Sequence, residues 1–407
     1  MIWEETQFVQ MLAYGNAEQR FFKHHRDLFD IITLPGTVAT YFRQGAGGFV
    51  LALKKHYFID PRTSVLQGRF QAVGREEPRH VRLATAHGRL TAAIFSQRSI
   101  RADDLTEQLK QEMLESILDF QVHYAESSSQ KLREYLSYLG QAPDIEPLPP
   151  HWITPPYFRA FRLGDDWYAA SLDMSRRALS QRLQLPVVPI VCIRKDCLSE
   201  AGAYARLADD WSGEFPSRLL WIDKLDGYRD PVPDLKAFLD LVTQFRDRGA
   251  RVFNLFGDYF FVMAMKVGLS GVGHGVGYGE SREALTTGGG LPAERYYVPA
   301  LHRFYPPPDA EILLRQVEDG SFLCRCEVCR RHIEGTELRV SHMSREDLLI
   351  HFLLTRREEI NHVLNTALDE LIDELAAAEG RLTPAVRFRG VDMGHLARWR
   401  DALKAFA

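Results

Sequence analysis

Residues 218–256 contain three segments that decide the fold class: RLLWID (218–223), DLKAFLDLVTQFRDR (234–248) and RVFNLF (251–256). The first and last are short apolar runs, which are typical of buried strands. The middle segment repeats apolar residues at helical spacing. Gly249 follows it, and glycine readily ends a helix because it adopts positive φ. A strand, a helix and a second strand in this order indicate a parallel α/β protein.

Similar apolar runs lie on both sides of this unit and extend the pattern. Six more strands are predicted, at residues 30–41, 56–66, 152–161, 186–193, 270–276 and 296–304. Eight strands with intervening helices predict a (β/α)8 TIM barrel. The interval between the second and third strands is too long for a simple crossover. There we expect an inserted hairpin, formed by residues 80–85 and 90–95, and a helix over residues 105–122 capped by Asp103 or Asp104.

Three parts of the chain are expected to form distinct units. The barrel should occupy residues 1–323, with the insertion at 68–150. A metal-binding subdomain and the last barrel helix should follow at 324–378, and the helix itself should begin near residue 344. Residues 379–407 should form a C-terminal extension.

Composition excludes several classes of protein. The 407 residues are 45% hydrophobic and 26% charged, which is ordinary for a globular chain and argues against disorder, collagen or a simple coiled coil. A formal net charge of −4 excludes a wholly basic nucleic-acid binder, although not a local basic groove. No apolar run reaches the roughly 18 residues that a bilayer span needs. The first residues, MIWEE, lack the apolar stretch of a signal peptide. We therefore expect a cytoplasmic protein without membrane contact.

The sharpest motif in the sequence is CRCEVC (324–329), a C-x-C-x₂-C cluster. Cys324, Cys326 and Cys329 are close enough in sequence to bind one tetrahedral metal ion. Zinc suits them better than a disulfide or an iron–sulfur cluster, which usually needs a fourth cysteine. A site with four protein ligands is structural, so we expect one structural zinc ion per chain. The candidates for the fourth ligand are His332, His342, His351 and His362.

A barrel with this motif after its last strand and a histidine on the following helix resembles the tRNA-guanine transglycosylase superfamily. That resemblance implies that the zinc subdomain lies between the last strand and the last helix. It also implies that His351 is the fourth ligand. Three segments are similar to the branch that modifies DNA, the 7-deazaguanine DNA transglycosylases: FIDPRT (58–63), GHGVGYGE (273–280) and RYYVPALH (295–302).

The resemblance implies an enzyme that exchanges guanine in DNA for a 7-deazaguanine base. Its partners would be DNA, the small-molecule base and accessory DNA-modification proteins. Two alternatives remain open from the sequence. One is a transglycosylase of the same superfamily that acts on tRNA, and the other is a catalytically silent, nucleic-acid-binding subunit with the same fold.

Base exchange with retention needs two carboxylates, one as nucleophile and one to move a proton, and barrel active sites lie at the carboxyl ends of the strands. Asp60 is the first candidate, because apolar residues precede it and the family comparison points to it. Asp258 is the second candidate, and Asp223 replaces it if it fails. The sequence departs from the family in two places. The loop after Asp60 lacks the family's two glycines, and the last predicted strand has Tyr296-Tyr297-Val298 where the family has its nucleophilic aspartate.

The glycine-rich residues 270–290 include the seventh predicted strand, and the small residues after that strand would let a flat purine lie against the backbone. Aromatic and histidine side chains on the last predicted strand could stack on a base. Each candidate aspartate could instead cap the helix that follows it, and the aromatic residues could instead pack in the core. The predicted substrate-binding residues are His274, Gly275, Tyr278, Glu280, Tyr296 and His302.

Overall fold

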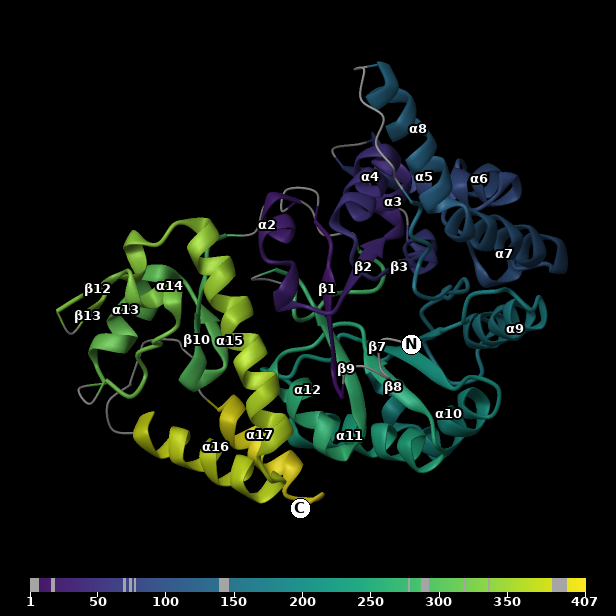
Figure 1. The fold of residues 1–407 in the computed structure, drawn as a ribbon. Helices are drawn as coiled ribbons and strands as arrows, with labels where there is room; N and C mark the ends of the chain where they lie inside the picture. Colours follow the sequence, from purple (N-terminus) through teal and green to yellow (C-terminus); the bar gives the residue numbers. More distant parts are fainter. Residues whose placement is uncertain are drawn as a thin grey trace.

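A curled sheet of seven parallel strands forms the centre of the protein (Figure 1). The computed structural model describes residues 7–15, 19–68, 71–72, 75–76, 78–138, 146–276, 279–286, 293–317, 320–335, 337–382 and 394–407. The strand order is β3-β2-β1-β9-β8-β7-β6. The strands are β1 (Val9–Ala13), β2 (Ile31–Pro35), β3 (Tyr57–Asp60), β6 (Ile190–Arg194), β7 (Ser217–Asp223), β8 (Arg251–Asn254) and β9 (Leu269–His274).

The predicted α/β class with a parallel sheet is therefore confirmed, but the predicted closed barrel is wrong. The two outer strands, β3 and β6, are separated by residues 151–160, which include most of the strand predicted at 152–161. This segment makes only isolated parallel bridges to the β6 side, at Ile153 and Ala160. On the β3 side, the His151 amide donates to the Tyr57 carbonyl at 2.7 Å. Pro155 and Pro156 lack amide hydrogens, so this stretch cannot supply a continuous ladder.

The strands differ from the prediction in other places too. The predicted strands at 30–41 and 56–66 end early, because the chain enters α3 (Gly36–Tyr41) after β2 and a 3₁₀ helix (Thr63–Gln67) after β3. The segment predicted as the last strand lies outside the sheet, where β10 (Tyr296–Val298) and β11 (Arg303–Tyr305) form an antiparallel hairpin. The chain reverses there because a short 3₁₀ turn begins at Pro299 and His302 adopts a φ of 50°. Strand β1, which was not predicted, lies between β2 and β9 in the sheet.

The sheet separates two buried clusters of side chains. Alternate strand residues point to opposite faces, and one face packs against the helices. The other face encloses an inner cluster made only of strand and loop residues. Aromatic side chains fill this interior, where the Trp152 ring lies 4.5 Å from that of Phe58 and 6.4 Å from that of Phe253.

The inserted segment is helical, so the predicted hairpin at 80–85 and 90–95 is wrong. Its helices are α5 (Pro78–Ala86), α6 (Arg89–Phe95), α7 (Glu107–Val122) and α8 (Tyr124–Tyr138). Leu83 and Ala84 are both buried although they are adjacent, which a helix allows and a half-exposed strand does not. Gly88 still forms the predicted turn, with a φ of 118°. The predicted helix over 105–122 is confirmed as α7, but the predicted cap at Asp103 or Asp104 is wrong. The cap is Thr106, whose side chain accepts from the Leu109 amide at 3.3 Å.

Helices surround the outer face of the sheet and form the C-terminal part of the protein (Figure 1). The predicted helix over 344–378 is two helices, because Thr366 is extended between them. The remaining helices are α2 (Gln19–His24), α3 (Gly36–Tyr41), α4 (Arg43–Leu53), α9 (Asp166–Ser180), α10 (Ala203–Ser212), α11 (Val232–Asp247), α12 (Tyr259–Met263), α13 (Pro307–Arg315), α14 (Glu327–Arg330), α15 (Arg345–Asn365), α16 (Leu368–Leu382) and α17 (His395–Leu403). Two small hairpins complete the fold, β4 (Gln71–Ala72) with β5 (Arg75–Glu76) and β12 (Ile333–Glu334) with β13 (Glu337–Leu338).

Within the described ranges, no helix combines the length and the apolar character that a membrane crossing requires.

Gly273 on β9 gives a test of the sheet geometry. A Cβ at this position would lie 2.1 Å from the Leu255 carbonyl oxygen, so Gly273→Ala must force backbone apart. We expect a loss of about 1–3 kcal/mol in the free energy of unfolding, measured by urea denaturation. The control is Gly45→Ala in the exposed part of α4, where a Cβ meets nothing within 4 Å and alanine should stabilise the helix slightly. Equal effects of the two substitutions would contradict this close packing.

Candidate functional site

Three cysteines and one histidine form a compact cluster between α14 and α15. One ligand atom from each of Cys324, Cys326, Cys329 and His351 lies within 4.8 Å of all the others. Two backbone amides hold the loop in place, because Cys326 N donates to Cys324 Sγ and Cys329 N donates to Cys326 Sγ, each at 3.4 Å. His351 Nδ1 lies 3.5 Å from Cys326 Sγ and 3.4 Å from Cys329 Sγ. The structure thus brings together the four predicted metal ligands.

The orientation of the His351 ring suits a metal ligand. Its Nε2 donates to the Tyr297 carbonyl at 2.7 Å, which leaves Nδ1 as the free donor atom facing the thiols. The Tyr296 ring stacks on the imidazole with centroids 4.4 Å apart and an interplanar angle of 3°. The cluster could therefore hold one metal ion, and its donor set is consistent with zinc.

The other three candidate histidines have different neighbours. His332 lies 3.5 Å from Asp347, His342 lies 3.6 Å from Glu334 and His362 lies 2.7 Å from Glu374. None of the three is among the residues of the cysteine cluster.

Asp60 and Asp223 lie at the carboxyl ends of β3 and β7, and both point into the inner cluster. Each follows the alternation of its strand, because Phe58 and Trp221, two residues earlier, belong to that cluster. The two carboxyl groups are 1% and 0% exposed. Both lie near the thiol of Cys192 on β6. Burial raises the pKa of that thiol, and the charges of Asp223 and Asp60 raise it further. Asp60, the first candidate, and Asp223, the predicted replacement for Asp258, therefore lie in one site.

The environment of Asp60 acts on its pKa in two opposing directions. Its Oδ1 accepts hydrogen bonds from the Tyr157 hydroxyl at 2.7 Å and from the Arg62 amide at 3.0 Å. Burial nevertheless raises the pKa of Asp60 above its usual range, and the Arg62 charge and these hydrogen bonds offset this only in part. The Arg62 guanidinium lies 4.7 Å from the Trp221 ring, in the same enclosed space.

Asp223 is held differently. Its Oδ2 forms an ion pair with Arg159 at 2.7 Å, and its Oδ1 accepts from the Ala284 amide at 2.7 Å. Arg159 and Tyr157 come from the irregular segment 151–160, between the two outer strands. Sequence reasoning missed both residues, because nothing in that proline-rich stretch indicates which acids it would lie against. Arg62 was also missed, although its position two residues after Asp60 was a usable signal.

Residues 279–286, which we call the covering segment, close this edge of the sheet. Besides the Ala284 amide on Asp223, the segment accepts three hydrogen bonds from neighbouring side chains. Ser64 Oγ donates to the Ala284 carbonyl at 2.8 Å, and Trp221 Nε1 donates to the Arg282 carbonyl at 3.0 Å. Arg62 donates to the Thr286 carbonyl at 2.6 Å. The segment therefore shields both acids from solvent in this state.

A second buried polar network lies on the outer side of the sheet, around Arg356 of α15. Its guanidinium is 2.6 Å from Glu280 Oε1 and 3.2 Å from Glu359 Oε2. Glu359 Oε1 also accepts from the Tyr297 hydroxyl at 2.8 Å and lies 2.6 Å from His302 Nδ1. Burial raises the pKa of Glu280 to about 7, although Arg356 acts in the opposite direction. The network ties the start of the covering segment to the helix that carries His351.

Asp258 belongs with this outer network, not with Asp60. Its side chain caps α12 by accepting from the Phe260 amide at 2.9 Å. Burial raises the pKa of Asp258 well above its usual range, and the charges of Glu280 and Asp226 add to that effect. Asp258 therefore acts as a helix cap, which was the alternative interpretation of this aspartate.

Four of the predicted substrate-binding residues have partners other than Asp60 and Asp223. Glu280 and His302 belong to the outer network, and His302 stacks on Tyr259 with centroids 3.6 Å apart. Tyr296 packs on His351. His274 is buried on the outer face, where it contacts Gln10 at 3.1 Å and the Gly275 carbonyl at 2.9 Å, and burial lowers its pKa to about 3. Tyr278 lies outside the described residues.

A scan against models of known protein families and a search of curated proteins each find no match to this chain.

The metal site can be tested by removing one thiol. Purified protein should carry about one metal ion per chain, and Cys326→Ser should lose it together with part of the folding free energy that metal binding contributes. His342→Ala is the control, because this histidine lies beside Glu334 and away from the cluster. Metal content is read by inductively coupled plasma mass spectrometry. An unchanged metal content in Cys326→Ser would reject the site.

Glu280 should make stability depend on pH. Its folded-state pKa, about 7, lies above the ordinary value of 4.5, so its contribution to stability is present below about pH 4.5 and is lost as pH rises through about 7. Glu280→Gln should remove this fall, and the exposed neighbour Glu283→Gln should keep it. Urea unfolding midpoints measured from pH 4.5 to 8 report the difference. Parallel curves for wild type and Glu280→Gln would refute the assignment.

Proposed function

We propose that the protein is a transglycosylase that exchanges guanine in DNA for a 7-deazaguanine base, with Asp223 and Asp60 as its two carboxylates. The observation that carries this proposal is the pair itself. Two buried acids share one edge of a parallel sheet, one ion-paired with Arg159 and the other with a raised pKa. Two carboxyl groups in contrasting environments are the arrangement that glycosyl transfer requires.

In the first step the Asp223 carboxylate attacks C1′ of the target nucleotide, and the bond from C1′ to N9 of guanine breaks. Asp60 gives its proton to the leaving guanine, so the products are an ester between Asp223 and the sugar and a neutral free base. In the second step N9 of the 7-deazaguanine attacks C1′ and the ester bond breaks. Asp60 takes the proton that the incoming base loses, and both carboxyl groups return to their starting states.

The covering segment would have to move for this reaction to occur. Its Ala284 amide donates to Asp223 Oδ1, and Ser64 holds the Ala284 carbonyl. Displacement of residues 279–286 would expose both acids and would free a carboxylate oxygen of Asp223 for attack. A target base within a duplex would also have to leave the stack to reach this edge.

For the metal cluster we propose zinc in a structural role. Three thiolates and one imidazole are a donor set that zinc prefers, and four protein ligands leave no position for substrate. The ion would fix α15 through His351, and the same helix carries Arg356 to the network at Glu280. Zinc would thus support the position of the covering segment and take no part in the chemistry.

The resemblance noted in the sequence is the reason for naming guanine exchange and DNA. Exchange on tRNA is the alternative within the same superfamily. A catalytically silent binding subunit is the alternative outside enzymes, and the 0–1% exposure of the two acids under residues 279–286 favours it.

Replacing each acid by its amide tests the proposal. Asp60→Asn and Asp223→Asn should each lower the rate of labelled-guanine exchange by at least about 100-fold, since each removes a proton carrier or a nucleophile. Asp258→Asn is the matched control, because asparagine also caps a helix well, and it should keep most of the rate.

The wild-type protein should be assayed with both DNA and tRNA. Exchange on tRNA alone would support the tRNA enzyme. No exchange on either nucleic acid would support the binding subunit. Wild-type rates in both Asp60→Asn and Asp223→Asn would show that these acids are not the catalytic pair.

A further inference from the structure

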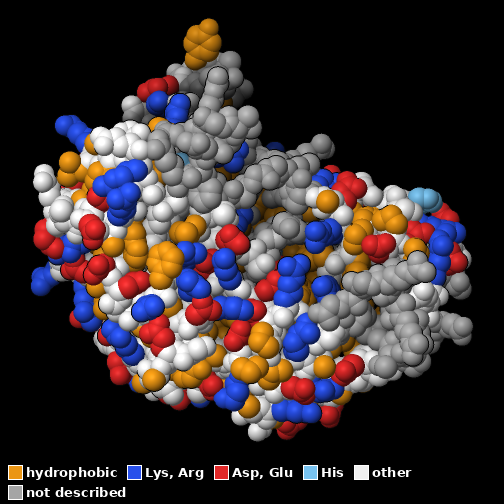
Figure 2. All heavy atoms as spheres, turned by 180° about the vertical axis from the view of Figure 1, so that it is seen from behind, with side chains coloured by type: hydrophobic (Ala, Val, Ile, Leu, Met, Phe, Trp, Pro, Cys, Tyr) orange, Lys and Arg blue, Asp and Glu red, His pale blue; other side chains and the backbone are white. Residues whose placement is uncertain are grey.

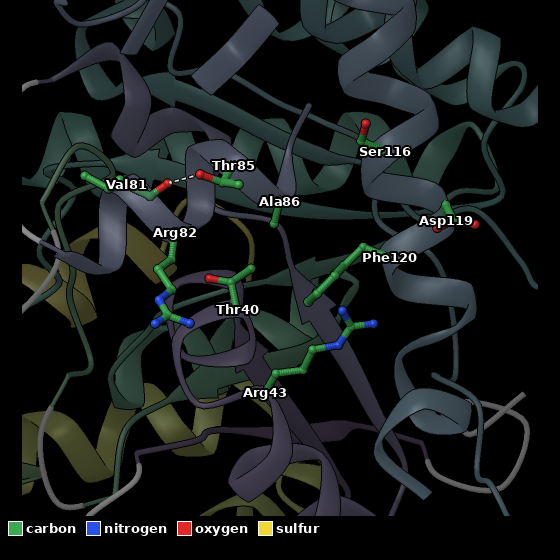
Figure 3. Close-up of a pocket in the computed structure, with 9 residues that line it drawn as sticks. All are labelled: Thr40, Arg43, Val81, Arg82, Thr85, Ala86, Ser116, Asp119 and Phe120. Carbon is green, nitrogen blue, oxygen red and sulfur yellow. Dashed lines mark hydrogen bonds between the residues drawn. The ribbon is translucent and has the colours of Figure 1, made fainter. Parts of the chain in front are cut away.

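A groove with a volume of about 650 Å³ lies on the helical insertion, apart from the sites described above. Figure 3 shows it between the α3–α4 corner, α5 and α7. Arg43, at the start of α4, and Arg82, on α5, both point into this space (Figure 3). We call it the arginine groove.

The two arginines have no acidic partner. Within the described part of the chain, neither Arg43 nor Arg82 forms an ion pair. Arg43 donates to the Ser127 hydroxyl at 2.9 Å, and its guanidinium lies 5.1 Å from the centre of the Phe120 ring. Arg82 lies 5.6 Å from the Tyr41 ring. Both guanidinium groups therefore rest against aromatic rings, and their N–H groups remain available to an anion.

Both threonine side chains of the groove are already engaged. The Thr40 hydroxyl donates to the Gly36 carbonyl at 2.7 Å, and the Thr85 hydroxyl donates to the Val81 carbonyl at 2.9 Å. The carboxylate among the lining residues, Asp119, lies 3.0 Å from His123 Nδ1. The groove thus holds two guanidinium groups and one carboxylate, and guanidinium donors favour phosphate.

This arrangement contrasts with other parts of the surface. On the rear face, lysines and arginines lie among aspartates and glutamates over the part of the chain that is described (Figure 2). A neighbouring cavity near α8 has Arg133 at its wall, but also Glu126 and Glu134. Neither surface concentrates positive charge in a concave site as the arginine groove does.

The groove also lies beside the edge of the sheet that holds Asp60. Gly36, the first residue of α3, packs so tightly there that a Cβ would lie 2.9 Å from the Asp60 carbonyl oxygen. Thr40 lines the groove one helical turn later on the same helix. The groove therefore begins about one helical turn along α3 from the backbone of Asp60.

We propose that the arginine groove binds the phosphodiester backbone of a DNA strand, next to the nucleotide that enters the acid site. The inference rests on the proposed function for the identity of the polymer, and it adds a binding site on the insertion. Phosphate contacts of this kind position a nucleic acid without reading its sequence. The groove would therefore contribute affinity and register but no base specificity.

The test measures binding of a fluorescein-labelled single-stranded DNA oligonucleotide by anisotropy at several salt concentrations. The double variant Arg43→Gln/Arg82→Gln should bind about tenfold more weakly near physiological salt. The slope of log affinity against log salt should fall by about 1.4, because each phosphate contact to a single strand contributes about 0.7. The control, Arg176→Gln/Arg248→Gln, removes the same charge from arginines paired with Glu214 and Asp209 and should bind as wild type does.

A third variant, Arg43→Lys/Arg82→Lys, tests whether weaker binding comes from the lost charges or from a loss of folded structure. It keeps both charges and should recover most of the salt dependence, while thermal unfolding followed by circular dichroism reports whether each variant is folded. No binding by the wild type, or equal losses in the Gln variant and the control, would overturn the groove assignment.

The outcomes also separate this inference from the proposed function. Wild-type protein that binds DNA through the two arginines but exchanges no base would contradict base exchange and leave the groove standing. Normal DNA binding by Arg43→Gln/Arg82→Gln, in a protein that does exchange guanine, would contradict the groove alone.

Discussion

The contacts of Asp223 connect three parts of the protein: strand β7, the irregular segment 151–160 and the covering segment. Its carboxylate joins β7 to Arg159 of the irregular segment and to the Ala284 amide of the covering segment. A buried carboxylate is costly unless it is paired and hydrogen-bonded, and this one has both kinds of partner. Asp223 and Asp60 lie in the same enclosed space. The irregular segment that carries Arg159 lies between β3 and β6, where a regular strand would close the barrel.

The cluster of three cysteines and His351 is connected to this site through α15. α15 carries His351 at the cluster, and Arg356 and Glu359 further along the same helix. Arg356 is fully buried and pairs with Glu280, the second residue of the covering segment. One arginine faces Glu280 and Glu359 directly, with the charges of Asp226 and Asp258 close by. Burial raises the pKa of Glu280, and the charges of Glu359 and Asp226 raise it further, so the ion pair with Arg356 offsets the shift only in part.

The sequence predicts a large part of the fold and the three cysteines of the candidate metal site, because both depend on local patterns, whereas His351 was one of four candidate histidines and was singled out by the resemblance. Residues 218–256 form the expected strand, helix and strand, and CRCEVC (324–329) lies against His351. The misses are non-local. Tyr296–Val298 has the apolar character of a buried strand, but a turn at Pro299 pairs it with a neighbour outside the sheet. Likewise, the position of Asp223 at a strand end is visible in the sequence, whereas its pairing with Arg159, 64 residues earlier, is decided by tertiary packing.

The central claim is that Asp223 forms a covalent bond to the sugar while Asp60 handles the proton. The most direct measurement is mass spectrometry of the protein after incubation with guanine-containing DNA and rapid acid quenching. The account predicts a protein–DNA adduct that maps to the peptide containing Asp223, disappears on addition of the incoming 7-deazaguanine and is absent from Asp223→Asn. An adduct at a different residue, or exchange of guanine without any adduct on Asp223, would contradict it.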